Sequence, residues 1–286
     1  ASRLAAAFHD PQVIAATGFV RGRNGFSYQW QASEIDQLGR DHPLDVTEAG
    51  THAARHGRAI KTQGTNCAFR RTTLMQAGGF DEAYQFYLED ADIGLRLATH
   101  GRTAVVPGAQ VHHGFAASER RRANRVPTDL TQIGASSQVF LRRHAGPALW
   151  PDALSRLRAE QSDRLALHRR ANRISAAEET RLLATLEDGI HQGEARFLPA
   201  LTPIQSTIEN PVFLPLPGTG PRPGRVIAGR IWQARRLRDQ ATQAAAKGEI
   251  VTLILLSPTI RAHRHHFTPA GFWEQTGGLF GPSERS

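Results

Sequence analysis

A cluster of prolines in the last third of the chain most constrains what it can fold into. Seven of the 16 prolines fall between residues 199 and 223. Proline fixes φ and lacks a backbone N–H, so this density disfavours a helix or a central strand. We therefore predict an extended linker or wrapping loop over residues 199–225. It separates a long N-terminal part from a last segment of residues 226–286.

Residues 1–118 predict a mixed α/β segment. The hydrophobic pattern and the Gly and Pro positions place short elements between turns. We expect strands over 13–20, 104–106 and 110–113, and a short strand or loop over 64–69. We expect a helix within 27–38, a helix over 72–77 ended by Gly78 and Gly79, and a helix through Ile93 and Leu97 ended by Gly101.

The amino-acid composition changes after Ser118. Residues 119–198 are rich in Leu, Ala, Arg and Glu, with helical spacing of Leu154, Leu157 and Leu165. We predict a helical extension there. A last helix over 226–246 and a strand over 250–256 should follow the linker, forming a C-terminal helix-strand segment over 226–286.

Composition narrows the class of protein. Apolar residues make up 40% of the 286, enough for a sizeable core, and no apolar run approaches the ~20 residues that span a bilayer. Cys67 is the single cysteine, which excludes an internal disulfide and fits a reducing compartment, so we expect a cytoplasmic protein. The start lacks both a methionine and a secretory pattern, and we expect the chain to begin within a longer protein.

The basic charge is confined to the C-terminal part. Residues 1–118 hold 11 Lys+Arg and 11 Asp+Glu, so residues 119–286 carry the whole excess of +9. Arginines at 120–125 and 230–238 suggest contact with anionic lipid headgroups or an anionic acceptor, although a solvated basic face is the alternative. No nucleic-acid recognition motif accompanies the charge, so we expect no nucleic-acid partner.

Glu89 and Asp90 are the candidate acid–base residues. They begin the helix that contains Ile93, where free N–H groups and the helix dipole favour ionised carboxylates. An ionised carboxylate can accept a proton from an acceptor hydroxyl. The alternative is an acidic first turn that only stabilises the helix.

The block from Gly64 to Ser118 resembles a known family. It contains, in order, GTN-x-AFRR, GGFDE, an ED pair before LRL, and P-x-A-x-V-x-H. Over residues 4–118 it is similar to the second half of the catalytic domain of family 2 glycosyltransferases, inverting enzymes with the GT-A fold. The fold class implied is α/β: an incomplete, Rossmann-like GT-A half-domain over 1–118 on the acceptor side, with a mainly helical C-terminal extension.

The resemblance implies roles for two acids and one histidine. Asp90 would be the catalytic base, with Glu89 orienting it or touching the acceptor. His113 would face the donor diphosphate and its Mg²⁺ or Mn²⁺, while His112 should point the other way because strand residues alternate. A hydrogen-bonded histidine at a strand end is the alternative for His113.

Further residues are implied as substrate contacts. Gly64, Thr65 and Asn66 would lie beneath the transferred sugar, with Asn66 offering both a donor and an acceptor. Arg70 and Arg71 could neutralise phosphate or remain solvated. Asp90-Ala91-Asp92 spells the D-x-D metal motif, but the resemblance places that motif before Ala1. We therefore expect Asp92 to be a helix-start residue.

The expected function is transfer of a sugar, with inversion, from a nucleoside-diphosphate sugar to a saccharide or lipid-linked acceptor in surface polysaccharide or glycolipid synthesis. The protein would be cytoplasmic or peripheral at the inner face of the membrane. Most of the donor site would lie outside this chain, so the chain alone should be nearly inactive. The alternative is a truncated, non-catalytic binding module whose basic C-terminal part contacts an anionic partner.

Overall fold

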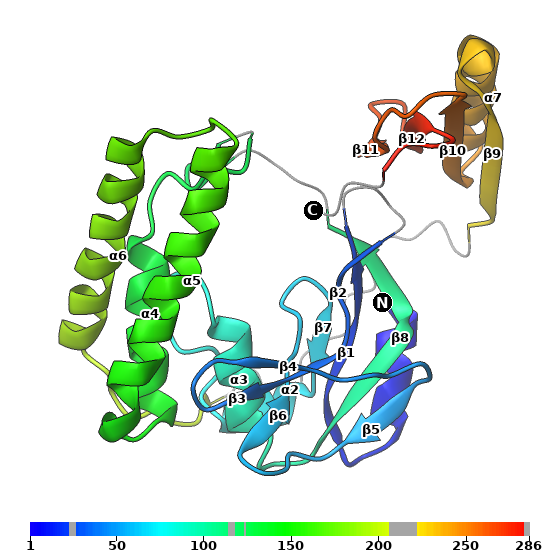
Figure 1. The fold of residues 1–286 in the computed structure, drawn as a ribbon. Helices are drawn as coiled ribbons and strands as arrows, with labels where there is room; N and C mark the ends of the chain where they lie inside the picture. The colour runs from blue at the N-terminus through cyan, green and yellow to red at the C-terminus, as the bar shows by residue number, and fades with distance from the viewer. Residues whose placement is uncertain (23–26, 114–117, 123, 206–221, 283–286) are drawn as a thin grey trace. The chain divides into compact units, whose positions relative to one another are not determined.

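The computed structural model describes residues 1–22, 27–113, 118–122, 124–205 and 222–282 (Figure 1). Their internal contacts divide the chain into two compact units. Unit 1 comprises Ala1–Phe19, Gln31–Gln110 and Ala116–Gln205, and unit 2 comprises Val20–Trp30, Val111–Phe115 and Ser206–Ser286. The four segments predicted above stay a prediction.

Two sheets form the strand framework of the N-terminal part. The first has the order β2-β1-β8-β5, with β7 pairing antiparallel to β1, and the second has the order β4-β3-β6. β1 is buried over eight of its nine residues, as the apolar run predicts. The strands are β1 (Val13–Arg21), β2 (Tyr28–Trp30), β3 (Ser33–Asp36), β4 (Asp41–Pro43), β5 (Gly50–His52), β6 (Arg58–Ile60), β7 (Cys67–Phe69) and β8 (Arg102–His112).

The helices of unit 1 belong to two groups. Three short ones accompany the strands: α1 (Ser2–Ala6), α2 (Arg71–Gln76) and α3 (Glu89–Leu97). Three long ones follow where a helical segment was predicted: α4 (Thr131–His144), α5 (Trp150–Arg170) and α6 (Ala176–Ala195). Single 3₁₀ turns span Ala7–His9 and Pro147–Leu149. Within the described ranges, no helix is long and apolar enough to cross a membrane.

Glycine lets α4 and α6 approach each other closely. A Cβ on Gly189 would lie 2.0 Å from the Thr131 carbonyl oxygen, and one on Gly134 would lie 2.3 Å from that of Leu186. Leucines then fill the space between the three helices, including Leu165, Leu182 and Leu186. Phe140 of α4 packs in a second cluster with Ile35 of β3 and Ala91 of α3, so the helical group is tied to the candidate site region.

Unit 2 contains a four-stranded sheet covered by one helix. β9 (Gly224–Arg230) and β10 (Ile250–Ser257) are parallel and joined through a 3₁₀ turn (Ile231–Gln233) and α7 (Ala234–Ala246). β12 (Trp273–Gly278) continues the parallel sheet, and β11 (Arg264–Phe267) closes its edge antiparallel to β12. Leu237 and Ala241 of α7 pack on Val251, Leu253 and Leu255 of β10.

Two element predictions in the first part of the chain were wrong. Residues 27–38 were expected to be helical, but β2 and β3 occupy this stretch. The period-2 alternation of Tyr28, Trp30 and Ala32 is the strand signal that the helical reading missed. Residues 104–113 were expected as two strands, but β8 runs through Pro107 and Gly108. β5 pairs only with residues 103–105, so the missing N–H of Pro107 removes no bond to that neighbour.

The predicted helix over 226–246 was wrong in its first part. Residues 226–230 belong to β9, whose β-branched Val226 and Ile227 favour a strand, and α7 begins only at Ala234. The strand over 250–256 is confirmed as β10. Gly78 and Gly79 also adopt left-handed φ values of 81° and 70° just after α2, as predicted for a helix end. Residues 206–221 of the predicted linker lie outside the described residues.

Candidate functional site

The candidate site begins with an unusual backbone immediately before α3. Tyr87 and Leu88 both adopt left-handed φ values, of 77° and 68°, although neither is glycine. Each such residue costs on the order of 1 kcal/mol and persists only where packing enforces it. The buried Leu88 side chain packs with Ile35 and Ala91, which provides that packing. The chain therefore turns sharply into the helix and places Glu89 and Asp90 in its first turn.

Asp90 is held by the segment that precedes β7. Its Oδ2 accepts a hydrogen bond of 3.0 Å from the Gly64 backbone N–H, and its carbonyl oxygen accepts one of 3.1 Å from Thr62 Oγ1. The Asp90 side chain is half-buried, whereas Gly64 and Thr65 are exposed. The structure thus brings Asp90 and Gly64 together, as the resemblance implied. Thr62 was missed, because a lone threonine in a loop carries no sequence signal.

Glu89 carries an unusual oxygen. Its Oε2 is buried and has no hydrogen-bond partner among the described residues, although the side chain as a whole is half-buried. Leaving a buried carboxylate oxygen unpaired costs on the order of 1–3 kcal/mol. A ligand hydroxyl would relieve that cost. This fits the expected role of Glu89 beside the base, which stays a prediction.

Asn66 is more constrained than the sequence suggested. It is buried, and its Nδ2 donates both to the Phe19 carbonyl, at 3.0 Å, and to the Ala109 carbonyl, at 2.9 Å. An amide has two N–H donors, so both are engaged within the protein. The expectation that Asn66 offers a donor to a sugar is therefore corrected. Its contribution as an acceptor and the roles of Gly64 and Thr65 stay predictions.

The two arginines at the start of α2 differ in their contacts. Arg70 donates through Nε to the Val13 carbonyl and through Nη2 to the Phe8 and Asp10 carbonyls, so it links α2 to the entry of β1. Arg71 is exposed in the first turn of α2. The structure therefore leaves Arg71, and not Arg70, as the cation that could meet a phosphate.

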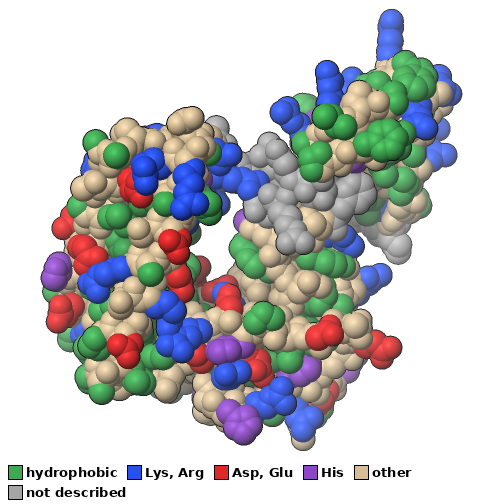
Figure 2. Space-filling model, viewed as in Figure 1, with side chains coloured by type: hydrophobic (Ala, Val, Ile, Leu, Met, Phe, Trp, Pro, Cys, Tyr) green, Lys and Arg blue, Asp and Glu red, His purple; other side chains and the backbone are tan. Residues whose placement is uncertain are grey.

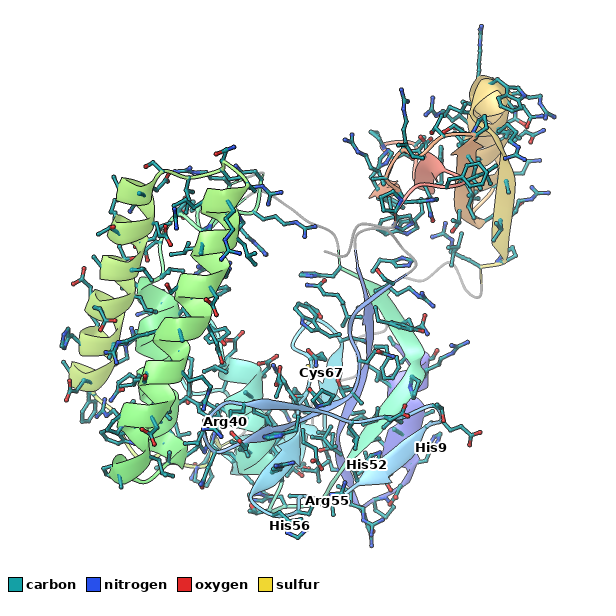
Figure 3. The ribbon with its side chains drawn as sticks, in the orientation of Figure 1. His9, Arg40, His52, Arg55, His56 and Cys67 are labelled. Atoms are coloured by element: carbon teal, nitrogen blue, oxygen red, sulfur yellow. The ribbon has the colours of Figure 1, made fainter. Side chains whose placement is uncertain are left out.

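Cys67 lies on β7 beside this site (Figure 3). Burial, and next the negative charge of Asp90, raise the pKa of its thiol to about 11. Its Sγ lies 3.9 Å from the Gly64 carbonyl oxygen. The thiol is therefore a protonated neighbour of the carboxylate, and it reports on the charge of Asp90.

We expect Asp90→Asn to increase the alkylation rate of Cys67. At pH 8 only about one thiol in 10³ is ionised at a pKa of about 11, and removing the nearby charge lowers that pKa. Iodoacetamide labelling, followed by mass spectrometry on this single-cysteine chain, measures the rate. Glu82→Gln, which removes an exposed carboxylate, should leave it unchanged. An equal rate in Asp90→Asn and the unmodified chain would mean that the two groups are not neighbours.

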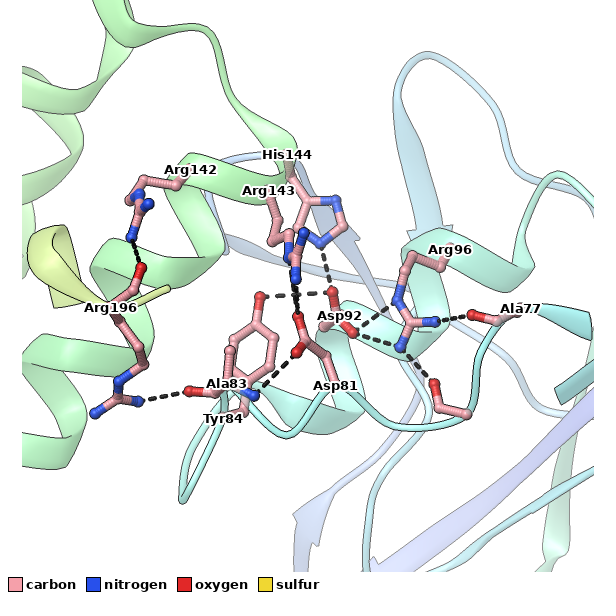
Figure 4. A network of polar contacts seen from close by, with 11 residues as sticks. Ala77, Asp81, Ala83, Tyr84, Asp92, Arg96, Arg142, Arg143, His144 and Arg196 are labelled. Carbon is pink, nitrogen blue, oxygen red and sulfur yellow. Dashed lines mark hydrogen bonds and ion pairs between the residues drawn. The ribbon is translucent and has the colours of Figure 1, made fainter. Parts of the chain in front are cut away.

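Asp92 has a structural role, and Figure 4 shows its contacts. The fully buried carboxylate accepts from Arg96 Nε at 2.8 Å and Nη2 at 2.7 Å, and its Oδ1 lies 2.9 Å from His144 Nε2. Arg96 also donates to the carbonyls of Ala77 and Gly79. Asp92 therefore joins α3 to the end of α4 and to the turn after α2. Its carboxylate is engaged by the side chains of Arg96 and His144, and the expectation that it is not a metal ligand stays a prediction.

The pKa of Asp92 shows that these partners outweigh burial. Burial alone would raise this pKa, but the hydrogen bonds from His144 and Arg96 hold it below its ordinary value. The Asp92–Arg96 pair at i and i+4 was readable from the sequence as a helical ion pair. His144 was not, because it is 52 residues away in the chain.

His113 belongs to unit 2, whereas Asp90 belongs to unit 1. Its Nδ1 lies 2.9 Å from Gln29 Oε1, and its ring packs on Trp30 with centroids 5.3 Å apart. A hydrogen bond at one ring nitrogen orients an imidazole in the way seen for metal-binding histidines. The proximity of His113 to Asp90 stays a prediction.

His112 has a different set of neighbours, as strand alternation predicts. Its ring meets His265 at 4.7 Å and Trp273 at 5.5 Å between centroids. His265 also stacks on Trp273, and burial lowers the pKa of His265 to about 4. His263 contacts the Gly278 carbonyl at 2.9 Å. His263 and His265 are therefore only partly exposed and contact neighbouring groups of unit 2.

The described residues do not assemble a metal site by themselves. No group of three or more His, Cys, Asp or Glu side chains with suitable geometry occurs among them. The divalent ion expected from the resemblance, and His113 as its ligand, stay predictions.

A pocket of about 450 Å³ is lined by residues that precede the candidate base and its contacts in the chain. It is lined by Tyr87 and Leu88, which precede Glu89, and by Lys61, which precedes the Thr62 and Gly64 contacts to Asp90. Helices α4 and α5 supply the opposite wall. The charged lining side chains are Arg40, Asp41, Lys61, Arg156 and Glu160. Lys61 pairs with Asp41 at 2.9 Å, and Arg156 pairs with Glu160 at 3.5 Å.

Unit 1 thus has a carboxylate fixed at a helix start and an unpaired buried oxygen on the residue before it, and the two residues before that line a polar pocket. Together they define a candidate group-transfer site. Comparison with known proteins finds a family match for the N-terminal part of the chain. Residues 2–127 match the model of the glycosyl transferase family group 2, which confirms the family 2 resemblance over that segment.

Two curated relatives match a shorter stretch. Both are named N-acetylglucosaminyl-diphospho-decaprenol L-rhamnosyltransferase, from Mycobacterium tuberculosis strains CDC 1551 / Oshkosh and ATCC 25618 / H37Rv. Each is 40% identical over 85 residues, which is 29% of this chain and 27% of the relative. The match thus spans about a quarter of their length. No solved structure matches the chain significantly.

Proposed function

We propose that this chain takes part in transferring a sugar from a nucleoside-diphosphate sugar to an acceptor hydroxyl with inversion. Unit 1 would contribute the acceptor-side half of a GT-A domain. The observation that carries the proposal is the Asp90 carboxylate, held by the Gly64 N–H at 3.0 Å in the first turn of α3. The family match over residues 2–127 supports the reaction class.

In this proposal the base acts from a fixed position. Asp90 accepts the proton of the acceptor hydroxyl as that oxygen attacks the sugar, and the Gly64 hydrogen bond keeps the carboxylate aimed. Glu89 Oε2 is the natural partner for a second acceptor hydroxyl, because it is buried without one. Gly64 and Thr65 form the exposed turn against which the transferred sugar would lie.

The donor side of the proposal involves His113, Arg71 and a divalent cation. Mg²⁺ or Mn²⁺ would neutralise the charge that develops on the departing diphosphate. His113, oriented by Gln29, would hold that cation or a phosphate oxygen, and the exposed Arg71 would add positive charge. The expectation that this chain alone transfers little sugar remains part of the proposal.

The pocket beside Tyr87 is the proposed site for the acceptor saccharide. Its volume of about 450 Å³ suits a sugar unit, and its charged side chains can meet hydroxyl groups. α4 and α5 lie outside the matched residues 2–127, so this wall belongs to the extension of this chain. The relatives' name specifies a diphospho-decaprenol acceptor, which supports a lipid-linked acceptor for this chain. A role in polysaccharide or glycolipid synthesis and a place at the inner face of the membrane remain part of the proposal.

The second candidate is a non-catalytic binding module with a basic C-terminal part. The excess of +9 over residues 119–286 is the observation that favours it. The two candidate functions differ in whether the protein needs the Asp90 carboxylate for its activity. A binding module catalyses no transfer and would not need a base.

Incubation of the complete protein with a panel of nucleoside-diphosphate sugars tests the proposal. A polyprenyl-diphospho-N-acetylglucosamine acceptor and Mg²⁺ or Mn²⁺ complete the mixture, and mass spectrometry detects the product. We expect one donor to add a single hexose or deoxyhexose to the acceptor. Absence of any product with every donor, in protein that binds the acceptor, would favour the binding module.

A further inference from the structure

The parallel sheet of unit 2 brings three chain segments to one edge. Arg230 pairs with Leu256, and Ser257 pairs with Gly278, so β9, β10 and β12 end side by side. The following residues stay together, since Leu279 N–H donates to the Ser257 carbonyl at 2.8 Å and Phe280 N–H to that of Thr259 at 3.2 Å. We call residues 230–236, 257–264 and 276–280 the carboxyl edge. The 3₁₀ turn after β9 and the first turn of α7 belong to it.

Large apolar side chains are exposed along the carboxyl edge. Their exposed fractions run from 39% to 78%, in the residues Ile231, Trp232, Ile260, Leu279 and Phe280. Each of the three segments contributes at least one of them. Scattered exposed apolar residues are ordinary, but a group gathered by three strand ends marks an interaction surface.

Arginines without acidic partners accompany these apolar residues. Among the described residues, the guanidinium groups of Arg235, Arg236, Arg261 and Arg264 form no ion pair or hydrogen bond. The acids of this sheet are engaged elsewhere: Glu274 binds Arg238 at 2.6 Å, and Glu249 binds Arg225 at 3.3 Å. In Figure 2, blue basic and green apolar side chains lie next to each other on this unit.

The cations line two shallow pockets that share the 3₁₀ turn. Arg261 and Arg264 line one of about 410 Å³ with Ile231 and Ser257. Within the described ranges, Arg235 and Arg236 line one of about 590 Å³ with Trp232 and with one acid, Asp239, to which neither arginine is bonded. Each pocket thus combines two guanidinium groups with an apolar side chain at its margin. Guanidinium groups bind phosphate oxygens through paired N–H donors.

We propose that the carboxyl edge docks onto an anionic phospholipid bilayer. Its arginines bind lipid phosphates, and Trp232, Ile260 and Phe280 enter the headgroup region. Tryptophan favours this interface, and each basic residue near an anionic surface adds to the attraction. A nucleic-acid backbone offers no apolar surface for the exposed isoleucine and leucine side chains to contact, whereas a lipid bilayer does. This favours lipid as the partner. This inference stands independently of the proposed transfer reaction.

Vesicle sedimentation of the full 286-residue chain tests this proposal. We expect binding to vesicles of phosphatidylglycerol and phosphatidylcholine, and weak binding to phosphatidylcholine alone. Arg261→Glu with Arg264→Glu should lower the partition coefficient at least tenfold, since each cation contributes about fivefold near an anionic surface. Trp232→Phe should remove most of the fluorescence quenching that brominated lipids cause in the unmodified chain.

The matched control reverses the same charge at the opposite end of the sheet. Arg222→Glu with Lys247→Glu alters net charge equally, and both residues are exposed near the start of β10. It should retain most of the binding. The proposal is wrong if both double variants lose binding equally, if the chain ignores anionic vesicles, or if Trp232 stays unquenched. Binding to a duplex DNA probe without vesicle binding would identify a nucleic-acid partner instead.

Discussion

Asp90→Asn should reduce sugar transfer by the complete protein by a factor on the order of 10² to 10⁴. The amide keeps the size of the side chain but does not accept the acceptor's proton, so the loss falls on turnover. Donor affinity should change little, because the amide oxygen of the introduced asparagine can still accept the Gly64 N–H hydrogen bond and the proposed donor-side residues are unchanged. Initial rates, paired with calorimetric titration of donor and metal, separate the two effects.

His113→Ala provides the contrast for this prediction. Removing the imidazole should weaken metal-dependent donor binding as well as turnover, because His113 is proposed to act on the diphosphate side. If Asp90→Asn loses donor binding as severely as His113→Ala, or keeps near-normal turnover, Asp90 is not the base. Glu89→Gln would then be the next variant to measure, because its Oε2 is the adjacent unpaired oxygen.

Asp92→Ala should lower the free energy of unfolding by about 3–5 kcal/mol, the cost of removing one partner from a buried ion pair. The change leaves Arg96 and His144 buried without their shared carboxylate. Urea denaturation followed by circular dichroism measures the loss. Asp188→Ala, at an exposed position of α6, should change stability by less than about 0.5 kcal/mol.

The pH dependence gives a second readout of the same network. The pKa of Asp92 is lower in the folded chain than its ordinary value of 3.8, so its stabilising contribution is present above that value. It is lost as pH falls through the folded-state pKa. Asp92→Ala should therefore flatten the stability curve in this acid range. An Asp92→Ala chain as stable as Asp188→Ala, with an unchanged acid transition, would show that the network contributes little.

The sequence predicted correctly those helices and strands whose start, end or burial is determined by a few adjacent residues. The continuous apolar run gave β1, the acidic first turn gave the start of α3, and Gly78-Gly79 gave the end of α2. The family motif led to Asp90 and Gly64, which the structure brings within one hydrogen bond. These features need only a few neighbouring residues to be recognised.

The features that were missed depend on residues far apart in the chain. β9 and β12 are stabilised by pairing with β10, and the Gly277-Gly278 end of β12 reads as a turn in isolation. The contact of Asp92 with His144 joins separate helices. The pocket beside Tyr87 forms only when α4 and α5 pack against residues 38–41 and 87–88. The left-handed backbone at Tyr87 and Leu88 is likewise enforced by packing. It could not be predicted from the sequence, because neither residue is glycine.

A rapid-quench measurement shows whether Asp90 is the base that accepts the proton of the acceptor hydroxyl. The complete protein and its Asp90→Asn variant are mixed with saturating donor, metal and acceptor, and product is followed over a single turnover. If Asp90 is the base, the rate of sugar transfer in the variant falls by a factor on the order of 10² to 10⁴ while the fraction of bound donor stays the same. A single-turnover rate equal to that of the unmodified protein would contradict this role of Asp90.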